Sequence, residues 1–289
     1  MSDLIQDAAG DARNARILAR AASLAYRDEP AGAAGFKSEL GLDAKLVSVN
    51  NTQTYIAQDD KDIVVAFRGS QAPTSIDGLK DWLLTNANDF LIIPEGRAGT
   101  DFAAAGVGAR FHKGFVTALG DVWDGLFPLV DAAMQQKERP LWVTGHSLGG
   151  ALALVGAWRF QRQMAPVHQV YTFGAPMVGN ADVATAFEQA FPNKIFRFVD
   201  PSDLVSKLPT VSLIANAFAH CPAEVPLSDA TAAASNAFDF MKQLGGRVVD
   251  GILGNEHADS MWDYMKSSIM CHLMPNYLAK VDAKASQLP

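Results

Sequence analysis

Long apolar runs and cysteine are both scarce in this chain, and each scarcity narrows what the protein can be. Nowhere do about 18 uncharged apolar residues follow one another, so the sequence predicts no membrane-spanning helix. The N-terminal stretch has acidic residues where a secretory signal peptide has basic ones, and it lacks an apolar core of about 7 to 15 residues. The sequence therefore predicts a cytoplasmic location, or export by a route that needs no such signal.

The two cysteines and the charge balance exclude further classes. Cys221 and Cys271 either pair or stay reduced, and two cysteines are too few to indicate a redox compartment. With 24 basic against 31 acidic residues the net charge is -7, and no block of Lys and Arg is interleaved with aromatic residues. Nucleic acid is therefore not an expected partner, and any contact with lipid is expected to be apolar. A protein partner stays unidentified.

The length and the hydrophobic content predict one α/β domain over residues 1–289. The chain has 289 residues, 49% of them hydrophobic, which is enough for a single large core. Apolar spacing predicts an amphipathic helix over 12–27 and a second helix over 114–136, with Pro128 as a kink or restart. Residues 45–57 and 63–67 are rich in β-branched and aromatic side chains, and the polar residues between them predict a hairpin.

From residue 140 onward strands and helices alternate, which predicts a mostly parallel central sheet with helices on both sides. The short apolar runs Val170–Phe173 and Ile195–Val199 suit strands that are covered on both faces. In such sheets the chemistry lies at the carboxyl ends of the strands. Ser70, Ser147 and Asp203 all fall at such ends.

The run from Leu141 to Gly150 is the most informative part of the chain. It places an apolar strand, a Gly-x-Ser-x-Gly turn and an Ala- and Leu-rich helix in succession. This order is typical of a nucleophile elbow, in which Gly145 and Gly149 allow close approach of the backbone and Ser147 projects above the sheet. The alternative is a Gly-rich junction between a strand and a helix. We favour the nucleophile, because the strand and the helix are both present.

A nucleophilic serine needs a carboxylate and a histidine, and several residues compete for these two roles. The acid is Asp200 or Asp203, which both directly follow the run 195–199, and Asp200 stands before proline as a turn former does. If the base follows the acid, it is His220, His257 or His272. His272 stands late in the chain, just before the last predicted helix, whereas His257 has acidic neighbours typical of a solvated helix start.

Acyl transfer also needs donors for the oxyanion. The Leu148 N–H, next after the serine, is one candidate. Ser70 is the other, because it ends the predicted strand that runs into Arg68 and Gly69, although the same residues also fit an ordinary turn. This chemistry requires no cofactor and no metal ion.

Seven motifs in order resemble the class 3 lipase family, the fungal-type α/β hydrolases, over about residues 12–280. The motifs are Val65–Ser70, Asp81–Trp82, Phe111–Phe115, Val143–Gly150, Thr172–Pro176, Asp203–Pro209 and His272 with Tyr277. The resemblance implies an α/β-hydrolase fold with Ser147 as nucleophile, Asp203 as acid and His272 as base. It also implies that Ser70 and Leu148 bind the oxyanion, and that His112 and His220 are structural.

The resemblance implies a serine hydrolase that cleaves carboxylic esters of lipids, with a triacylglycerol lipase as the favoured interpretation. A phospholipase A1, a soluble esterase and a lipase-like binding protein without turnover are the alternatives. Apolar stripes make 71–93 and 230–253 the two candidate lids, and the alternative is that both stripes pack on the core. The second stripe lies in a predicted helical insertion over 210–256, a region that departs from compact fungal members. We expect a lipid or small ester substrate, bound at a lipid–water interface.

Overall fold

The computed structural model describes residues 3–69, 91–203, 205–207, 218–228 and 270–287. The helices are α1 (Ala12–Leu24), α2 (Ala31–Gly35), the π-helix η1 (Phe36–Leu40), α4 (Gly96–Ala103), α5 (Lys113–Gln136), α6 (Leu148–Arg162), α7 (Ala181–Ala190), the 3-10 helix η3 (Val205–Lys207) and α10 (Met274–Ala285). The strands are β1 (Asp43–Val49), β2 (Thr52–Gln58), β3 (Ile63–Phe67), β4 (Leu91–Ile92), β5 (Phe111–His112), β6 (Leu141–His146), β7 (Val167–Phe173), β8 (Gly179–Asn180), β9 (Ile195–Val199), β10 (Phe218–Ala219) and β11 (Glu224–Pro226).

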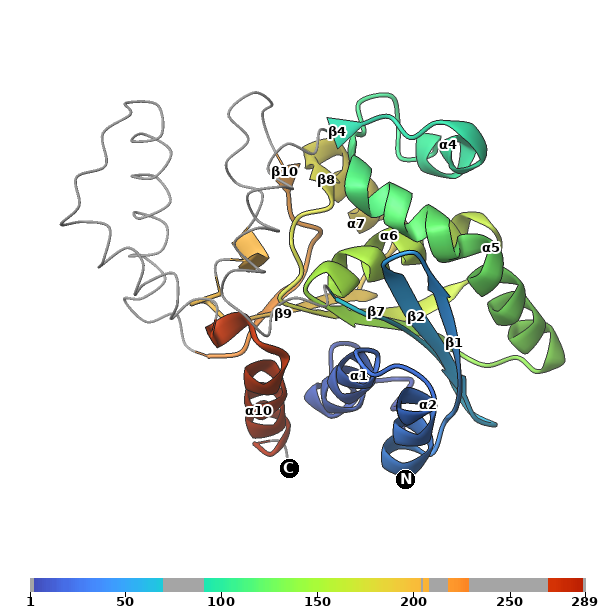
Figure 1. The fold of residues 1–289 in the computed structure, drawn as a ribbon. Helices are drawn as coiled ribbons and strands as arrows, with labels where there is room; N and C mark the ends of the chain where they lie inside the picture. Colours follow the sequence, from blue (N-terminus) through green and yellow to red (C-terminus); the bar gives the residue numbers. More distant parts are fainter. Residues whose placement is uncertain (1–2, 70–90, 204, 208–217, 229–269, 288–289) are drawn as a thin grey trace.

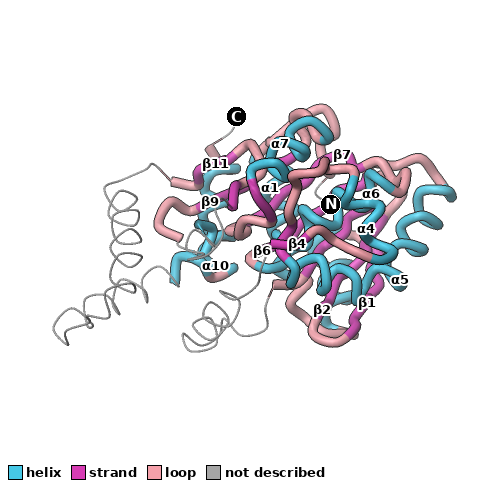
Figure 2. Tube along the Cα trace, turned by 90° about the horizontal axis from the view of Figure 1, so that it is seen from above, coloured by secondary structure: helices cyan, strands magenta, loops and turns pink. Residues whose placement is uncertain are grey.

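The main sheet that these residues form has seven strands in the order β1-β2-β3-β6-β7-β9-β11. The first three strands pair antiparallel, and every pair from β3 onward is parallel. Figure 2 shows this succession from β1 and β2 at one side to β9 and β11 at the other. A smaller antiparallel sheet has the order β10-β8-β5-β4. The mostly parallel sheet and the α/β class predicted from the sequence are confirmed.

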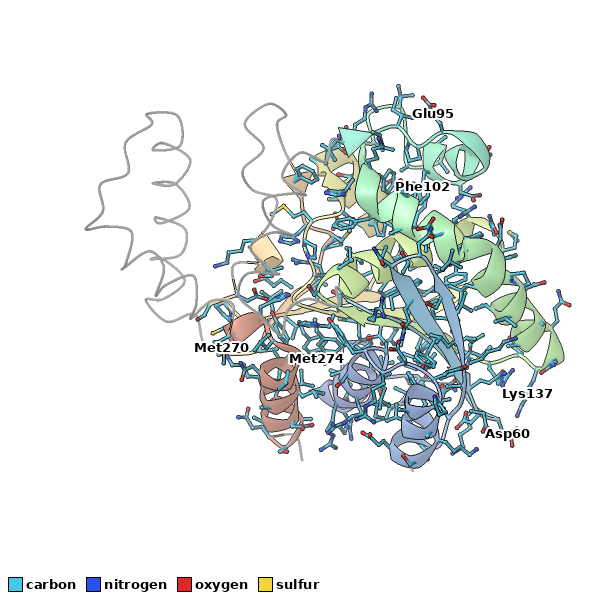
Figure 3. All side chains as sticks on the ribbon, viewed as in Figure 1. Asp60, Glu95, Phe102, Lys137, Met270 and Met274 are labelled. Carbon is cyan, nitrogen blue, oxygen red and sulfur yellow. The ribbon has the colours of Figure 1, made fainter. Side chains whose placement is uncertain are left out.

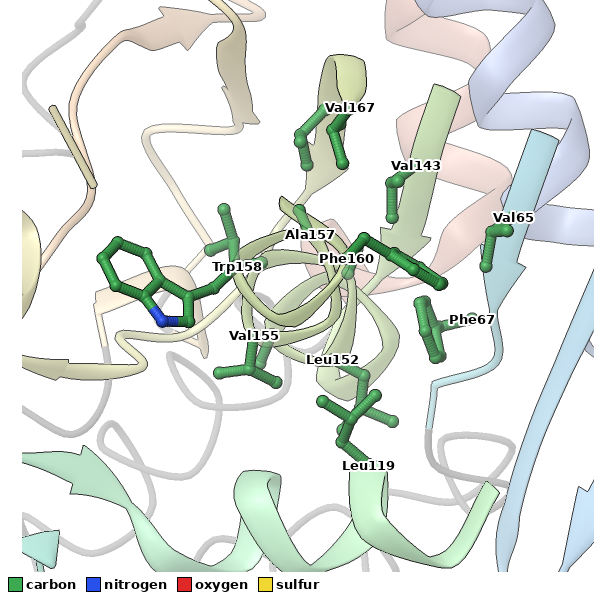
Figure 4. Close-up of a cluster of buried hydrophobic side chains, with 14 of the residues drawn as sticks. Val65, Phe67, Leu119, Val143, Leu152, Val155, Ala157, Trp158, Phe160 and Val167 are labelled. Carbon is green, nitrogen blue, oxygen red and sulfur yellow. The ribbon is translucent and has the colours of Figure 1, made fainter. Parts of the chain in front are cut away.

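Helices cover both faces of the main sheet, with α1, α2 and α10 on one side and α5, α6 and α7 on the other (Figure 1). Alternate residues of a strand therefore enter different cores. Val65 and Phe67 of β3 join the core around α6, whereas Val64 and Ala66 join the core around α1. Figure 4 shows Val65, Phe67 and Val143 gathered with the side chains of α6, among them Phe160. Burial on both faces explains why these strands read as unbroken apolar runs.

Two expectations about element boundaries need correction. Residues 45–57 do not form one strand, because β1 and β2 are a hairpin with a turn at Asn50 and Asn51. Asn50 has a φ of 53°, a left-handed conformation that asparagine tolerates better than most residues. Helix α5 runs continuously through Pro128, so the helix does not restart there.

The lid and the insertion predicted from the sequence fall largely on residues outside the described ranges. Of the range 71–93, the structure describes only the last three residues, which include β4. Of the range 210–256, it describes 218–228, which carries the short strands β10 and β11 and no helix. In the described part of the chain, no helix is both long enough and apolar enough to cross a membrane.

The start of α6 lies directly against the backbone of β3. A Cβ added at Gly149 would lie 2.3 Å from the carbonyl oxygen of Phe67 and 2.7 Å from the carbonyl carbon of Arg68. Both neighbours are main-chain atoms, which cannot rotate away as a flexible side chain can. Glycine at this position is therefore what lets the helix begin so close to the sheet.

We predict that Gly149→Ala destabilises the protein by about 1 to 3 kcal/mol, the usual cost of forcing a methyl group into filled space. The matched control is Gly120→Ala in α5, where an added Cβ meets nothing within 4 Å. Alanine there is expected to stabilise by about 0.5 to 1 kcal/mol through helix propensity. Denaturant unfolding monitored by tryptophan fluorescence measures the free energy of unfolding of both variants. Equal stability of the two variants would contradict the close packing of Gly149 on β3.

Candidate active site

Ser147 occupies the sharp turn between β6 and α6. Its backbone has φ 58° and ψ -131°, a conformation that is unfavourable for a residue with a Cβ. The Ser147 N–H donates a 2.9 Å hydrogen bond to the Phe173 carbonyl at the end of β7, and only 3% of the residue is exposed. Strain of this kind, held by surrounding structure, is typical of a nucleophile elbow.

The two glycines of the elbow touch each other across the turn. A Cβ added at Gly145 would lie 2.1 Å from the Gly149 carbonyl oxygen and 2.8 Å from the Gly150 nitrogen. Together with the contact of Gly149 on β3, this shows why both positions of the Gly-x-Ser-x-Gly pattern hold glycine. The turn closes tightly enough to fix Ser147 at the carboxyl end of β6.

Asp203 and His272 meet beside this turn although they lie far apart in the sequence. The Nδ1 atom of His272 is 2.8 Å from Oδ2 of Asp203, and both residues are fully buried. Asp203 lies just after β9 and His272 just before α10. Figure 3 labels Met270 and Met274, which flank His272 in the sequence, on the side of the molecule where α10 begins.

The remaining partners of Asp203 hold the carboxylate in place. Its Oδ2 accepts a 2.6 Å hydrogen bond from the Tyr277 hydroxyl, and its Oδ1 accepts a 2.8 Å hydrogen bond from the Val205 N–H. The Tyr277 hydroxyl in turn accepts from the Asp200 N–H at 3.2 Å. Burial, and then the charge of Asp203, raise the pKa of the Tyr277 hydroxyl well above its usual value, so Tyr277 stays a donor.

Asp200, the other candidate acid, has a different partner. Its side chain forms an ion pair with Lys280 of α10 and accepts from the Ser202 N–H. The Asp200 carbonyl accepts from the Asp203 N–H, which closes the turn between them. The structure thus brings Asp203, and not Asp200, into contact with a histidine.

The second ring nitrogen of His272, Nε2, has no hydrogen-bond partner among the described residues and can therefore accept a proton. Because Nδ1 is hydrogen-bonded to a carboxylate, the neutral ring carries its proton on Nδ1 and its lone pair on Nε2. Within the described ranges, Nε2 is buried and has no hydrogen-bond partner, and no hydrogen bond joins His272 to Ser147. The arrangement resembles that of a base in a resting enzyme, whose catalytic hydrogen bonds often tighten only with substrate.

Of the two proposed oxyanion donors, the structure describes Leu148 but not Ser70. Leu148 is the first residue of α6, where a backbone N–H has no acceptor within the helix. The positive end of the helix dipole lies at the same place. Ser70 lies outside the described residues, as do Asp81, Trp82 and the alternative base His257. Gly69, the last described residue before Ser70, lies next to the elbow, since a Cβ there would be 2.8 Å from the His146 carbonyl oxygen.

Of the other histidines in the described part of the chain, all but one lie outside this arrangement. His112 is buried and stacks on Phe115 with ring centroids 4.0 Å apart. Burial, and then the charge of Arg197, lower the pKa of His220 to about 3. The exception is His146, whose Nε2 lies 2.7 Å from the His272 carbonyl oxygen. Sequence reasoning gave His146 no role beyond its place in the elbow, and only its position next to Ser147 hinted at one.

Metal ligands and disulfides are absent from the site as far as the described residues show. No three His, Cys, Asp or Glu side chains within those ranges converge in a way that suits a metal ion. Cys221 is buried and Cys271 is partly exposed, and both are free thiols. The two cysteines therefore do not pair in this structure.

The sheet order, the flanking helices and the serine at the strand-to-helix turn define an α/β hydrolase. A family model described as lipase (class 3) matches residues 64–213, just over half of the chain. The chain therefore belongs to the class 3 lipase family, and the resemblance inferred from its motifs is confirmed.

The chain is also similar to individual lipases and to a phospholipase. A secreted mono- and diacylglycerol lipase 1 of Fusarium solani is 34% identical over 173 residues, which are 57% of this chain and 46% of that protein. A chloroplastic phospholipase A(1), DAD1 of Arabidopsis thaliana, is 27% identical over 165 residues, 53% of this chain and 35% of that protein. Among solved structures, the Lip2 lipase from Yarrowia lipolytica aligns with a TM-score of 0.58 at 22% identity, over 74% of this chain and 77% of that one.

The chain spans less than half the length of each of these two curated relatives. The structural likeness to the Yarrowia lipase covers more, but at this identity it concerns the fold alone.

We predict that Tyr277→Phe lowers the free energy of unfolding at pH 7 by about 1 to 3 kcal/mol, because Asp203 loses a donor and the Asp200 N–H loses its acceptor. The raised pKa of the Tyr277 hydroxyl adds a pH dependence. Above pH 10 the unfolded chain releases this proton and the folded chain retains it, so stability falls as pH rises. The variant is expected to lose stability less steeply there.

Denaturant unfolding at pH 7 and at pH values above 10 tests this account. The matched control is Tyr171→Phe, in which a buried hydroxyl that donates to Gln169 is removed away from Asp203. A Tyr277→Phe protein as stable as wild type at pH 7 would show that the Tyr277 hydroxyl does not support the carboxylate.

Proposed function

We propose that this protein is a serine hydrolase that cleaves carboxylic esters of lipids by an acyl-enzyme mechanism, with Ser147, His272 and Asp203 as its catalytic residues. The observation that carries the proposal is the buried Asp203–His272 pair beside a strained serine turn. The membership of the chain in the class 3 lipase family supports the same chemistry.

In the first half of the reaction, the Ser147 oxygen attacks the acyl carbonyl carbon while Nε2 of His272 takes the serine proton. The new C–O bond forms, the bond to the alcohol breaks, and His272 returns the proton to the leaving alkoxide. Water then repeats the sequence on the acyl-enzyme and releases the fatty acid. Asp203 holds Nδ1 of His272 and stabilises the positive ring, which is its role in such triads.

Negative charge develops on the carbonyl oxygen in both halves of the reaction. The Leu148 N–H at the start of α6 is positioned by the elbow itself and donates to this oxygen. Ser70 is proposed as the second donor, because it follows Gly69 in the sequence and the backbone of Gly69 lies against the elbow. Removing one such donor typically lowers kcat by about 10²- to 10³-fold.

For the substrate, we propose acylglycerols as the first class and phospholipids as the second. The Fusarium relative is a mono- and diacylglycerol lipase, which favours acylglycerols. The Arabidopsis relative is a phospholipase A(1), and this supports phospholipids as the alternative substrate class. Both reactions use the same serine, base and oxyanion donors, so the difference between them lies in the substrate pocket.

We predict that Asp203→Asn lowers kcat for ester hydrolysis by about 10⁴-fold, because an amide stabilises the wrong tautomer of His272. The matched control is Asp200→Asn, which makes the same change three residues earlier in a carboxylate paired with Lys280. It is expected to retain most of the wild-type kcat. Initial rates with an emulsified ester, together with the fraction of folded protein, measure both variants.

The same assay separates the candidate bases. His272→Ala is expected to abolish turnover to a residual level, and His257→Ala to leave it close to wild type. Residual catalysis of about 10³- to 10⁴-fold over water is normal in triad knockouts and decides nothing. Loss of activity in His257→Ala with retention in His272→Ala would refute the assignment of the base.

We predict that turnover of emulsified long-chain acylglycerols exceeds turnover of short dissolved esters, because the proposed substrate is presented at a lipid–water interface. Rates with a triolein emulsion, phosphatidylcholine vesicles and dissolved p-nitrophenyl acetate are compared for wild type, with Ser147→Ala as the blank. A preference for p-nitrophenyl acetate without any rise at the emulsion surface would favour a soluble esterase instead.

A further inference from the structure

His146, the residue before the proposed nucleophile, uses both of its ring nitrogens. Its Nε2 lies 2.7 Å from the main-chain carbonyl oxygen of His272, and its Nδ1 lies 2.8 Å from the hydroxyl of Tyr26. Only 1% of His146 is exposed. The proposed mechanism uses neither His146 nor Tyr26.

The connection allows one arrangement of protons. A carbonyl oxygen only accepts, so Nε2 of His146 carries the hydrogen and donates it to His272. The Nδ1 atom then accepts from the Tyr26 hydroxyl. Burial, and then the charge of His272, lower the pKa of His146 well below its usual value, so the ring stays neutral and keeps this tautomer. Burial likewise raises the pKa of the Tyr26 hydroxyl, which keeps it a donor.

The Tyr26 hydroxyl also touches Gly69, which follows β3 and precedes Ser70 in the sequence. A Cβ added at Gly69 would lie 2.0 Å from this hydroxyl oxygen, so glycine is required there by the position of Tyr26. Burial raises the pKa of the Tyr26 hydroxyl, and the charge of Arg68 and then the backbone of Gly69 lower it by less. One hydroxyl group thus contacts the strand end that precedes Ser70 and the residue that precedes Ser147.

The segment that carries Tyr26 is itself fixed to the sheet. Tyr26 follows α1, which packs against β6 and α10 (Figure 1). The side-chain amide of Gln53 in β2 donates to the carbonyls of Ala25 and Arg27, on either side of Tyr26. The buried guanidinium of Arg68 donates to the Gln53 side chain. The main chain around Tyr26 is therefore tied to Gln53 of β2, and through Gln53 to Arg68 just after β3.

We propose that Tyr26 and His146 are positioning residues that set the main chain of His272, and with it Nε2, relative to Ser147 and to the strand end before Ser70. The inference rests on the proposed function, because it concerns the geometry of that same site. Asp203 controls the orientation of the His272 ring from one side, and the hydrogen bond from His146 fixes the backbone of His272 from the other. In this proposal Tyr26 and His146 act through His272 and not through contact with the substrate.

The test is Tyr26→Phe, which removes one oxygen atom. Its matched control is Tyr55→Phe, because the buried Tyr55 hydroxyl donates to the nearby Arg27 carbonyl at 2.9 Å and does not contact His146. Steady-state kinetics with p-nitrophenyl butyrate, denaturant unfolding and the rate of labelling by a fluorophosphonate are measured for wild type and both variants.

The expected result is a 10- to 100-fold lower kcat and labelling rate for Tyr26→Phe, at a KM within about twofold of wild type, since a displacement of about 1 Å costs on this order. Tyr55→Phe is expected to keep the wild-type kcat. Both variants are expected to unfold at similar denaturant concentrations, so a general loss of stability does not explain the difference.

A second pair of variants tests His146 directly. The side-chain amide of glutamine donates a hydrogen bond as Nε2 of histidine does, so His146→Gln is expected to retain more kcat than His146→Ala. If the wild type neither hydrolyses esters nor reacts with the fluorophosphonate, the proposed function fails and the inference with it. If the wild type is active and Tyr26→Phe matches Tyr55→Phe, or His146→Ala matches His146→Gln, the inference alone is overturned.

Discussion

The close approach of backbone to backbone around Ser147 is the constraint on which the rest of this structure depends. Gly145 contacts Gly149 across the turn, and Gly149 contacts the Phe67 carbonyl of β3, so the start of α6 meets the end of this strand without any side chain between them. This contact holds Ser147 at a positive φ, at the end of a strand and the start of a helix. The position of the serine is thus set by the main chain, and the other site residues are brought to it.

The proposed acid Asp203 and the proposed base His272 come to this fixed point from loops that follow β9 and precede α10. Buried hydrogen bonds place them, from Tyr277 and Val205 to Asp203, and from Asp203 to His272. The hydrogen bond from His146 to the His272 carbonyl ties the second loop to the turn itself. Because each of these groups is buried, an unpaired partner would cost free energy, and the network therefore favours one geometry over many.

Sequence reasoning reached the elements and the elbow because their signals are local. The apolar run before Gly145 and the Ala- and Leu-rich helix after Ser147 lie within one short stretch, and strands buried on both faces show as unbroken apolar runs. The turn at Asn50 was missed, because two strands of similar composition flank it. The choice of Asp203 over Asp200, and the contact of Tyr26 with His146, depend on which distant segments pack together. No local pattern reports that, although the family resemblance supplied Asp203 and His272 as expectations.

The most direct measurement of the central claim is the site of covalent modification by a fluorophosphonate, mapped by peptide mass spectrometry on the wild-type protein. The account predicts a single adduct, on Ser147, that forms more slowly when a diacylglycerol competes and forms at a much lower rate in His272→Ala. An unmodified Ser147 under conditions that label other serine hydrolases, or an adduct on a different serine, would contradict it.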